Sequence, residues 1–220
     1  AYKIEVKGLN GGHSGMDIIK GLGNANKLMN RLLYSAINAI HICEIDGGSL
    51  RNAIPRESTS IIATDKNNDR FLEFSFLSEI DKIKEEFKTL EPNLEIKFVS
   101  TEVPEKFLNK KNSEGLLKSI YAAHNGVYRM SPDIKDLVET SNNIARIIVK
   151  DGQIKVGCLT RSSSETNKLD LANSLKSAFE LAGFDVEFSG EYPGWQPNVN
   201  SAILDVVANL YENLHKEKAN

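Results

Sequence analysis

The chain has 220 residues, of which 40% are hydrophobic, and a formal net charge of -3 at pH 7. This composition can build the core of one large domain or two small ones, and it offers no basic stripe with which a nucleic-acid-binding protein neutralises phosphates. No apolar run is long enough to cross a bilayer and no secretory signal opens the sequence, so we expect a cytoplasmic protein with neither nucleic-acid nor membrane partners.

The N-terminal stretch predicts a strand, a glycine-rich loop and a long helix. Apolar and polar residues alternate over residues 2–6, which is typical of a half-buried strand. The glycines of residues 8–15 allow a sharp bend that presents the imidazole of His13 with little surrounding bulk. Apolar residues then recur at three- and four-residue steps, which predicts a helix over residues 24–40. The loop alone leaves two interpretations of His13: a donor aimed at a substrate, or an exposed histidine in a turn.

The following segment completes a first structural unit. Strands are predicted over residues 41–46, 57–64 and 94–99. A helix is predicted over residues 69–90, with a buried stripe formed by Phe74, Leu77, Ile80, Ile83, Phe87 and Leu90. Because Pro55 cannot donate to a sheet ladder, we expect Asn52 to lie in an irregular, accessible turn. The order strand, helix, strand, strand, helix, strand is that of a ferredoxin-like sandwich.

A polar, lysine-rich joint leads into a second unit. We expect a helix capped by Ser113, then a strand over residues 137–140. Asp151-Gly152 is a strong two-residue turn signal and predicts a hairpin of strands over residues 144–149 and 154–159.

The end of this unit is predicted as a helix and a strand. The helix covers residues 165–182 and stops at Gly183, and Val186 and Phe188 mark the strand. The second unit therefore repeats the first in outline. The expected fold is α+β: two tandem ferredoxin-like α/β sandwich halves, with antiparallel sheet covered by helices.

The predicted halves give expected domain limits. The first half covers residues 1–103 and the second covers residues 104–199, and residues 200–220 form a helix that Asn200 caps. This last helix has no later element on which to pack, and the first residues enter a strand at once. We therefore expect the chain to be a piece of a longer protein.

Several kinds of active site find little support in the sequence. The histidines lie far apart without ligand spacing, and Glu85-Glu86 belongs to a charged helix face, so we expect no metal site in this chain. Ser14 lacks an acid placed to orient the neighbouring imidazole, which disfavours a catalytic triad. The glycine loop matches neither the dinucleotide nor the P-loop pattern. The two cysteines, Cys43 and Cys158, are too few for a disulfide framework and are expected to be free, buried thiols.

Three residues remain as candidates: His13, Asn52 and Arg161. Arg161 has a planar fork that can bind a carboxylate in two places, and the Asn52 amide can both donate and accept. Taken singly, each also has a structural interpretation. An arginine at a strand end is commonly a surface charge, and an asparagine in a turn commonly bonds its own backbone.

Four motifs in combination resemble those of the M20 metallopeptidases, and among them the bacterial aminoacyl-histidine (Xaa-His) dipeptidases, also called peptidase D and similar to carnosinases. They are Gly11-Gly12-His13-Ser14-Gly15, Leu50-Arg51-Asn52-Ala53-Ile54-Pro55, Leu137-Val138-Glu139-Thr140-Ser141-Asn142-Asn143 and Tyr192-Pro193-Gly194-Trp195. The resemblance runs over nearly the whole chain in the family's order. It covers only the lid domain of that family.

The resemblance implies a lid that is inactive alone. A separate catalytic domain of the family holds two zinc ions and a glutamate base, and none of its motifs is in this chain. His13 corresponds to the lid histidine that donates to the carbonyl oxygen of the tetrahedral intermediate. Asn52 and Arg161 correspond to residues that hold the substrate, with Arg161 facing the C-terminal carboxylate of a dipeptide. The implied partners are that dipeptide, the chain's own catalytic domain and, in a possible homodimer, a second copy.

Two questions stay open at this stage. In some relatives the lid histidine reaches the active site of a neighbouring subunit, whereas a doubled lid would let His13 act in cis. The alternative function is a tandem ferredoxin-like regulatory module that binds a small molecule without hydrolysis.

Overall fold

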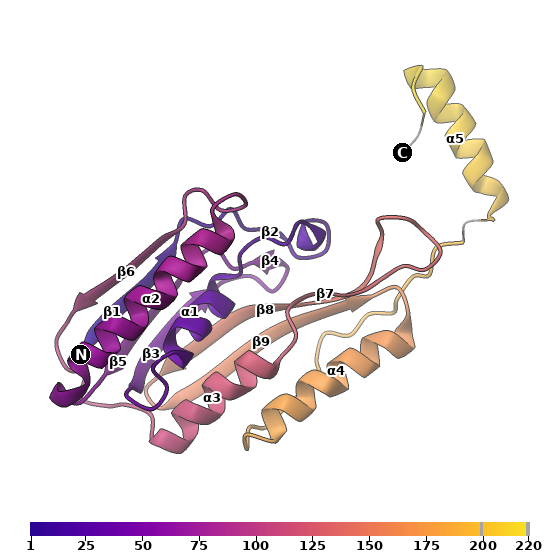
Figure 1. Ribbon diagram of the computed structural model, residues 1–220. Coiled ribbons are helices and arrows are strands. Elements are labelled where there is room, and N and C mark those ends of the chain that lie inside the picture. Colours follow the sequence, from indigo (N-terminus) through magenta and orange to yellow (C-terminus); the bar gives the residue numbers. More distant parts are fainter. Residues whose placement is uncertain (199, 219–220) are drawn as a thin grey trace.

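A computed structural model of the protein describes residues 1–198 and 200–218 (Figure 1). The strands are β1 (Tyr2–Lys7), β2 (Gly12–His13), β3 (His41–Gly48), β4 (Ala53–Ile54), β5 (Ser58–Ala63), β6 (Glu95–Ser100), β7 (Gly126–Met130), β8 (Val138–Lys150) and β9 (Gln153–Ser162). The α-helices are α1 (Ala25–Tyr34), α2 (Asp69–Phe87), α3 (Lys110–Ala122), α4 (Glu165–Glu180) and α5 (Ala202–His215), and short 3-10 turns cover Ile18–Lys20 and Lys66–Asn68.

One antiparallel sheet runs through both predicted halves. Its strand order is β6-β1-β5-β3-β8-β7, and β9 pairs with the other edge of β8. The first four strands with α1 and α2 have the ferredoxin-like order, as predicted. The halves join where β3 pairs with β8, from Ile45 opposite Val149 to Gly48 opposite Arg146. The predicted α+β class, an antiparallel sheet covered by helices, is confirmed.

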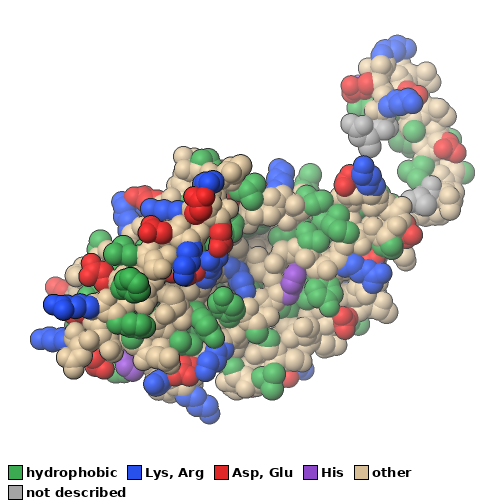
Figure 2. Space-filling model, viewed as in Figure 1, with side chains coloured by type: hydrophobic (Ala, Val, Ile, Leu, Met, Phe, Trp, Pro, Cys, Tyr) green, Lys and Arg blue, Asp and Glu red, His purple; other side chains and the backbone are tan. Residues whose placement is uncertain are grey.

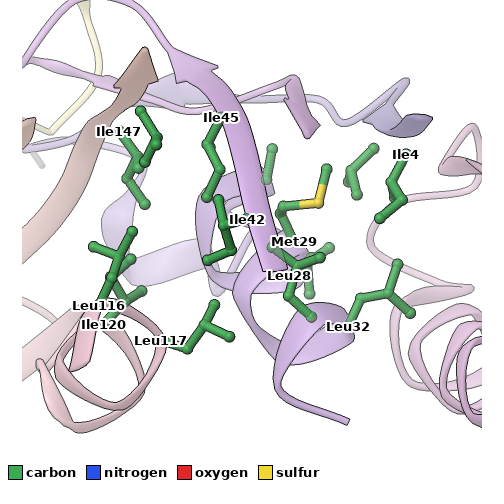
Figure 3. Close-up of a cluster of buried hydrophobic side chains, with 14 of the residues drawn as sticks. Ile4, Leu28, Met29, Leu32, Ile42, Ile45, Leu116, Leu117, Ile120 and Ile147 are labelled. Carbon is green, nitrogen blue, oxygen red and sulfur yellow. The ribbon is translucent and has the colours of Figure 1, made fainter. Parts of the chain in front are cut away.

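Helices α1 to α4 form a row on one face of the sheet (Figure 1). Helix α1 contacts α2 on one side and α3 on the other, and α3 contacts α4. Figure 3 shows the core that this row covers, in which side chains of α1 and α3 meet those of the strands. Its fully buried members include Ile4, Leu32, Ile42 and Leu117. Burial of this apolar area is the main favourable term for folding.

Helix α1 is shorter than the predicted residues 24–40. Asn24 is its N-cap, and the side-chain oxygen accepts from the backbone N–H groups of Asn26 at 3.0 Å and Lys27 at 3.2 Å. After Tyr34 the backbone tightens into turns whose N–H groups bond three residues back, such as Ala36 to the Leu33 carbonyl. The predicted apolar face nevertheless stays buried, including Ala36 and Ile40.

The predicted buried stripe of α2 is wrong in part. Ile80 and Ile83 are buried, but Phe74 is 74% exposed and Leu77 is 52% exposed. The face toward the sheet is instead completed by Leu72 and Phe76. Because apolar residues lie on both sides of the N-terminal part of this helix, three- and four-residue spacing selects no single face there.

The second half corrects several predicted elements. Residues 138–150 form one continuous strand, β8, where two strands separated by polar residues were predicted, and β7 was not predicted. The strand predicted at Val186 and Phe188 is absent, since residues 184–189 have no regular structure. Asp151 and Gly152 do form the hairpin turn, with φ angles of 52° and 79°.

Two predicted helix caps are also wrong. Asn109 caps α3, because its side-chain oxygen accepts from the Asn112 N–H at 2.8 Å, while Ser113 is buried inside the helix. The last helix follows Ser201, and not Asn200. Gly183 has a φ of 86° just beyond α4, which agrees with its predicted role as a stop.

Helix α5 stands apart from the sheet and its row of helices (Figure 1). Its apolar side chains are exposed, among them Ile203, Val207 and Leu214. Across the described residues, no helix is both long and apolar enough to span a membrane. The predicted limits at residues 103 and 104 stay predictions, and the limit at residue 199 and the last residues, 219–220, lie outside the described residues.

Candidate functional site

The glycine-rich loop is bent back against the turn that contains Asn52. Gly8 and Gly11 have φ angles of 79° and 63°, which L side chains rarely adopt. A Cβ atom at Gly8 would lie 2.1 Å from the Asn93 carbonyl oxygen, so a side chain cannot replace this glycine without a shift. The bend lets β2 pair with β4, with His13 opposite Ala53.

The His13 ring is held by the turn that follows it. Its Nδ1 accepts from the backbone N–H groups of Gly15 and Met16, each at 3.2 Å. Because Nδ1 acts as an acceptor, the proton of the neutral imidazole lies on Nε2. The ring therefore presents one N–H donor on the side away from its own turn.

Asp17 closes the same turn. Its Oδ2 accepts from the backbone N–H of His13 at 2.7 Å, and the Asp17 N–H donates to the His13 carbonyl at 2.8 Å. The hydrogen bond from Lys20, followed by that from His13, lowers the pKa of the Asp17 carboxyl. Asp17 therefore stays ionised near neutral pH and fixes the backbone that carries the imidazole.

Asn52 lies directly beside this loop. Its backbone carbonyl accepts from the Ser14 N–H at 2.8 Å. Asn52 is exposed and lies in a turn, as predicted. The carbonyls on either side of it, of Arg51 and Ala53, accept from Asn143 Nδ2 at 3.2 and 2.8 Å. A fully buried side chain of β8 thus holds the backbone on both sides of Asn52.

Arg161 reaches the loop from the second half of the chain. It lies near the end of β9, opposite Ser141 of β8. A Cβ built on Gly15 would lie 3.3 Å from an Arg161 terminal nitrogen, Nη1, and 3.1 Å from His13 Cε1. The two side chains therefore flank the same glycine. Arg161 Nε is buried and has no hydrogen-bond partner among the described residues.

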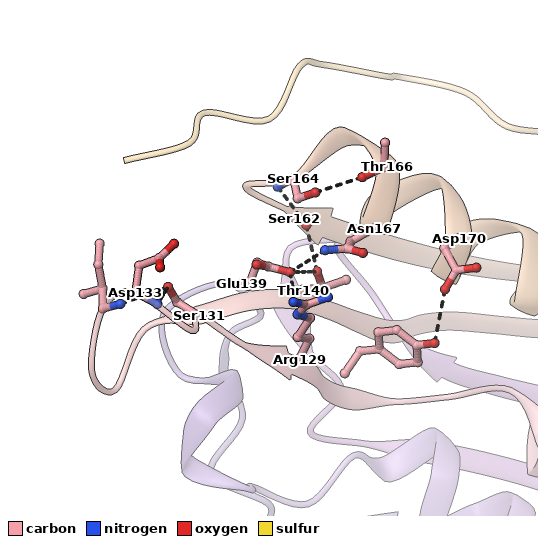
Figure 4. Close-up of polar contacts among 12 residues, drawn as sticks. Arg129, Ser131, Asp133, Glu139, Thr140, Ser162, Ser164, Thr166, Asn167 and Asp170 are labelled. Atoms are coloured by element: carbon pink, nitrogen blue, oxygen red, sulfur yellow. Dashed lines mark hydrogen bonds and ion pairs between the residues drawn. The ribbon is translucent and has the colours of Figure 1, made fainter. Parts of the chain in front are cut away.

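Polar contacts fix the end of β9 beside Arg161 (Figure 4). The hydroxyls of Thr140 and Ser162 are 2.7 Å apart, and Ser162 Oγ also accepts from the Ser164 N–H. Glu139 accepts from Asn167 at 2.6 Å and lies 3.3 Å from Arg129 Nε. Strand β9 thus enters α4 in a fixed geometry, which limits where the Arg161 backbone can lie.

A cavity of about 580 Å³ lies beside the site. Its walls come from β9, α4 and residues 183–192, with Arg51 and Arg161 among them and apolar side chains such as Val156 and Phe179. A hollow of this size with an apolar wall and a few cations is of the kind that holds small molecules.

Other candidate chemistries gain no support. Among residues 1–198 and 200–218, no group of three or more His, Cys, Asp or Glu side chains is arranged to hold a metal ion. The Ser14 hydroxyl is buried and, among those residues, bonds to nothing. Cys43 and Cys158 are free, as predicted, but only Cys43 is buried, whereas Cys158 is partly buried in the wall of the cavity. Desolvation raises the pKa of both thiols, that of Cys158 to about 11.

Comparison with known proteins shows which proteins this chain resembles. Residues 4–94 match the family model of the M20 peptidase dimerisation domain. Over these residues the chain is similar to the M20 peptidase dimerisation domain. The whole chain is 36% identical to the cytosol non-specific dipeptidase of Escherichia coli. It also superimposes on the crystal structure of the aminoacylhistidine dipeptidase of Vibrio alginolyticus with a TM-score of 0.88, at 37% identity over 100% of this chain.

The chain covers only part of each relative. It spans 46% of the length of the Escherichia coli dipeptidase and 45% of the Vibrio chain. The similarity extends beyond the matched dimerisation domain into the second half, which contributes Arg161. The resemblance to M20 peptidases inferred from the four motifs is confirmed.

Sequence reasoning brought His13, Asn52 and Arg161 forward but missed the residues that hold them. Asn143 was quoted only as part of a motif, although a polar residue inside a buried strand is a signal of a specific hydrogen-bonding role. Asp17 gave a weaker signal, because an acid four residues after a histidine occurs in many turns.

Proposed function

We propose that this chain, with its M20 dimerisation-domain region and the second half that contributes Arg161, is the substrate-clamping lid of a zinc-dependent aminoacyl-histidine dipeptidase that cleaves Xaa-His and related dipeptides in the cytoplasm. The observation that carries the proposal is the meeting of His13 and Arg161 over Gly15. A hydrogen-bond donor and a cation at one place suit a small substrate that has both a reacting carbonyl and a free carboxylate.

His13 is the donor in this proposal. With Nδ1 occupied by two backbone N–H groups, the Nε2–H is the atom that can bond the carbonyl oxygen of the scissile amide. Negative charge grows on that oxygen as the tetrahedral intermediate forms. A preorganised donor of this kind lowers the barrier by about 3 kcal/mol.

Arg161 and Asn52 hold the ends of the substrate. The guanidinium fork pairs with the C-terminal carboxylate, and such a partner would also satisfy the buried Nε, which bonds to no atom of the residues that the structure describes. Asn52 is exposed and its backbone carbonyl is bonded to the His13 loop, so its side-chain amide is proposed to donate to or accept from the peptide.

The metal belongs to the other part of the enzyme. The described residues offer no suitable ligand group, so the catalytic domain, contributed by sequence outside this chain, would hold the two zinc ions. Bound there, they would polarise the carbonyl and supply an activated water. Closure of the lid then brings the residues described above to the substrate, and the lid alone is inactive.

The continuous sheet supports the proposal that His13 acts on the active site of its own chain, even in a homodimer. Because β8 of the same chain occupies the edge of β3, the second half stands where a partner's sheet would pair, and it delivers Arg161 to His13 within one chain. A surface for a second copy remains on α2, which exposes Phe71, Phe74 and Leu77 inside the matched dimerisation domain. Exposed hydrophobic side chains are visible on this side of the molecule (Figure 2).

The test compares two variants of the full-length protein with an Xaa-His dipeptide. We expect His13→Ala to lower kcat about 100-fold or more with little change in KM, because its interaction is made in the transition state. We expect Arg161→Ala chiefly to raise KM. Equal and mild effects from both variants would contradict the assigned roles. So would zinc-dependent hydrolysis by the 220-residue chain alone.

The regulatory alternative makes a different prediction for the rest of the protein. A dipeptidase requires a His-x-Asp motif and a Glu-Glu pair in the remaining sequence, with further metal ligands. A small-molecule sensor requires none of them, and reading the complete gene decides between the two.

A further inference from the structure

A buried glutamate lies beneath the two ends of the His13 loop. Glu91 follows α2 and is 2% exposed. Its own backbone is fixed, since its N–H donates to the Phe87 carbonyl at 2.7 Å and its carbonyl accepts from Leu94 at 3.0 Å. The Glu91 side chain therefore extends from a turn whose backbone is held between α2 and β6.

Each carboxylate oxygen binds one end of the loop. Oε2 accepts from the backbone N–H of Asn10 at 2.7 Å, and Oε1 accepts from the backbone N–H of Gly23 at 2.8 Å. Asn10 precedes β2, and Gly23 immediately precedes the N-cap of α1. The segment between these two amides contains His13 and the whole turn that orients its ring.

Further contacts hold the turn that contains Glu91 against the His13 loop. Asn10 Nδ2 donates to the Leu90 carbonyl at 2.6 Å. A Cβ on Gly23 would lie 2.7 Å from Leu9 Cδ2 and 3.4 Å from Glu91, so the chain approaches the carboxylate closely at this end. The loop is thus attached at both ends to one short connection between α2 and β6.

The chemistry of these bonds makes the attachment strong. Burying a carboxylate is costly unless its oxygens are hydrogen-bonded, and here each oxygen has a backbone donor. Hydrogen bonds to an ionised acceptor are about twice as strong as those between neutral groups. Releasing either amide would leave a buried charge partly unsatisfied, which resists opening of the loop.

We propose that Glu91 is a positioning residue for His13: it fixes the two ends of the loop so that the imidazole keeps its place opposite Arg161. This inference rests on the proposed role of His13 in catalysis. A displacement of about 1 Å at a reacting group can cost about 100-fold in rate, so a residue remote from the substrate can control turnover.

The experiment uses E91Q, H13A and the double variant of the full-length protein. Glutamine keeps the shape of Glu91 but replaces one acceptor with an NH2 group, which would face the N–H of Asn10 or Gly23. The matched control is E79Q, because Glu79 is a partly buried carboxylate of α2 whose partners are Arg31 and Lys82. The readouts are kcat and KM, thermal unfolding, and hydrogen exchange of the Gly15 and Met16 amides that bond the imidazole.

We expect E91Q to lower kcat about 10- to 100-fold with KM within about twofold, and to speed exchange of those two amides. E79Q should leave kcat within about twofold. In the H13A background, E91Q should change kcat by less than about twofold, because the group that it positions is gone.

Two results would overturn the proposal. One is a lower unfolding temperature for E91Q with an unchanged kcat, and the other is a loss of kcat as large with His13 absent as with it present. If H13A alone leaves kcat unchanged, the proposed function fails instead. The exchange of the Gly15 and Met16 amides then still decides whether Glu91 holds the loop.

Discussion

Gly15 separates His13 from Arg161, and replacing it with alanine tests whether their spacing matters. The added Cβ would lie 3.1 Å from His13 Cε1, 3.3 Å from His13 Nδ1 and 3.3 Å from Arg161 Nη1. Ordinary contacts of a Cβ begin near 3.4 Å, so each side chain must move by a few tenths of an ångström. Both groups are side chains, and the backbone at Gly15 does not require a positive φ.

We therefore expect G15A to separate activity from stability. The free energy of unfolding should change by less than about 1 kcal/mol, because the strain is small and alanine also restricts the unfolded chain. The kcat/KM of the full-length protein should fall about tenfold, since the donor and the cation are both displaced.

The assays are steady-state kinetics with an Xaa-His dipeptide and chemical unfolding of the same sample. G157A is the matched control, because it lies on the same strand as Arg161 and its nearest contact, Arg146 Cβ, is at an ordinary 3.4 Å. If G15A keeps kcat/KM within twofold, His13 and Arg161 do not act on one substrate across this glycine.

Two further predictions concern Asn143 and Cys158. Asn143→Ala removes the donor to the carbonyls on both sides of Asn52 and should lower the free energy of unfolding by about 3 kcal/mol, measured by urea titration; a loss below about 1 kcal/mol would contradict this role. Since burial raises the pKa of the Cys158 thiol to about 11, about one thiol in a thousand is ionised at pH 8. Iodoacetamide should then alkylate it far more slowly in the native protein than in urea, as followed by mass spectrometry, and equal rates would refute the burial argument.

The sequence predicted elements best where one pattern had a single explanation. The residue pattern of α1 and of β1 has apolar residues on one side only, and that side is the one buried in the structure. Helix α2 was predicted in the right place, but its buried face was wrong in the N-terminal part, because Phe71 and Phe74 are as apolar as the buried Leu72 and Phe76. Strand β8 was split because three consecutive polar residues, 141–143, suggest a loop, although tertiary hydrogen bonds pair the side chains of Asn142 and Asn143 inside the sheet.

The candidate residues could be named from the sequence, but their arrangement in space could not. Motif resemblance singled out His13, Asn52 and Arg161, yet no local pattern places β9 next to a loop almost 150 residues earlier, about the length of a separate domain. That meeting depends on the pairing of β3 with β8, which only the folded sheet reveals. The role of Glu91 could not be predicted from the sequence either. Its two partners are remote in sequence, and they are backbone N–H groups, which nearly every residue type has.

The shared edge between β3 and β8 has a consequence for how the site responds to dilution. When two sheets belong to separate molecules, their pairing weakens as the protein becomes scarce, whereas covalent linkage keeps the effective local concentration of the second sheet constant. Here the strand that brings the arginine and the strand beside the histidine's turn are tied by one polypeptide. Their encounter is therefore independent of how many copies of the protein a cell contains.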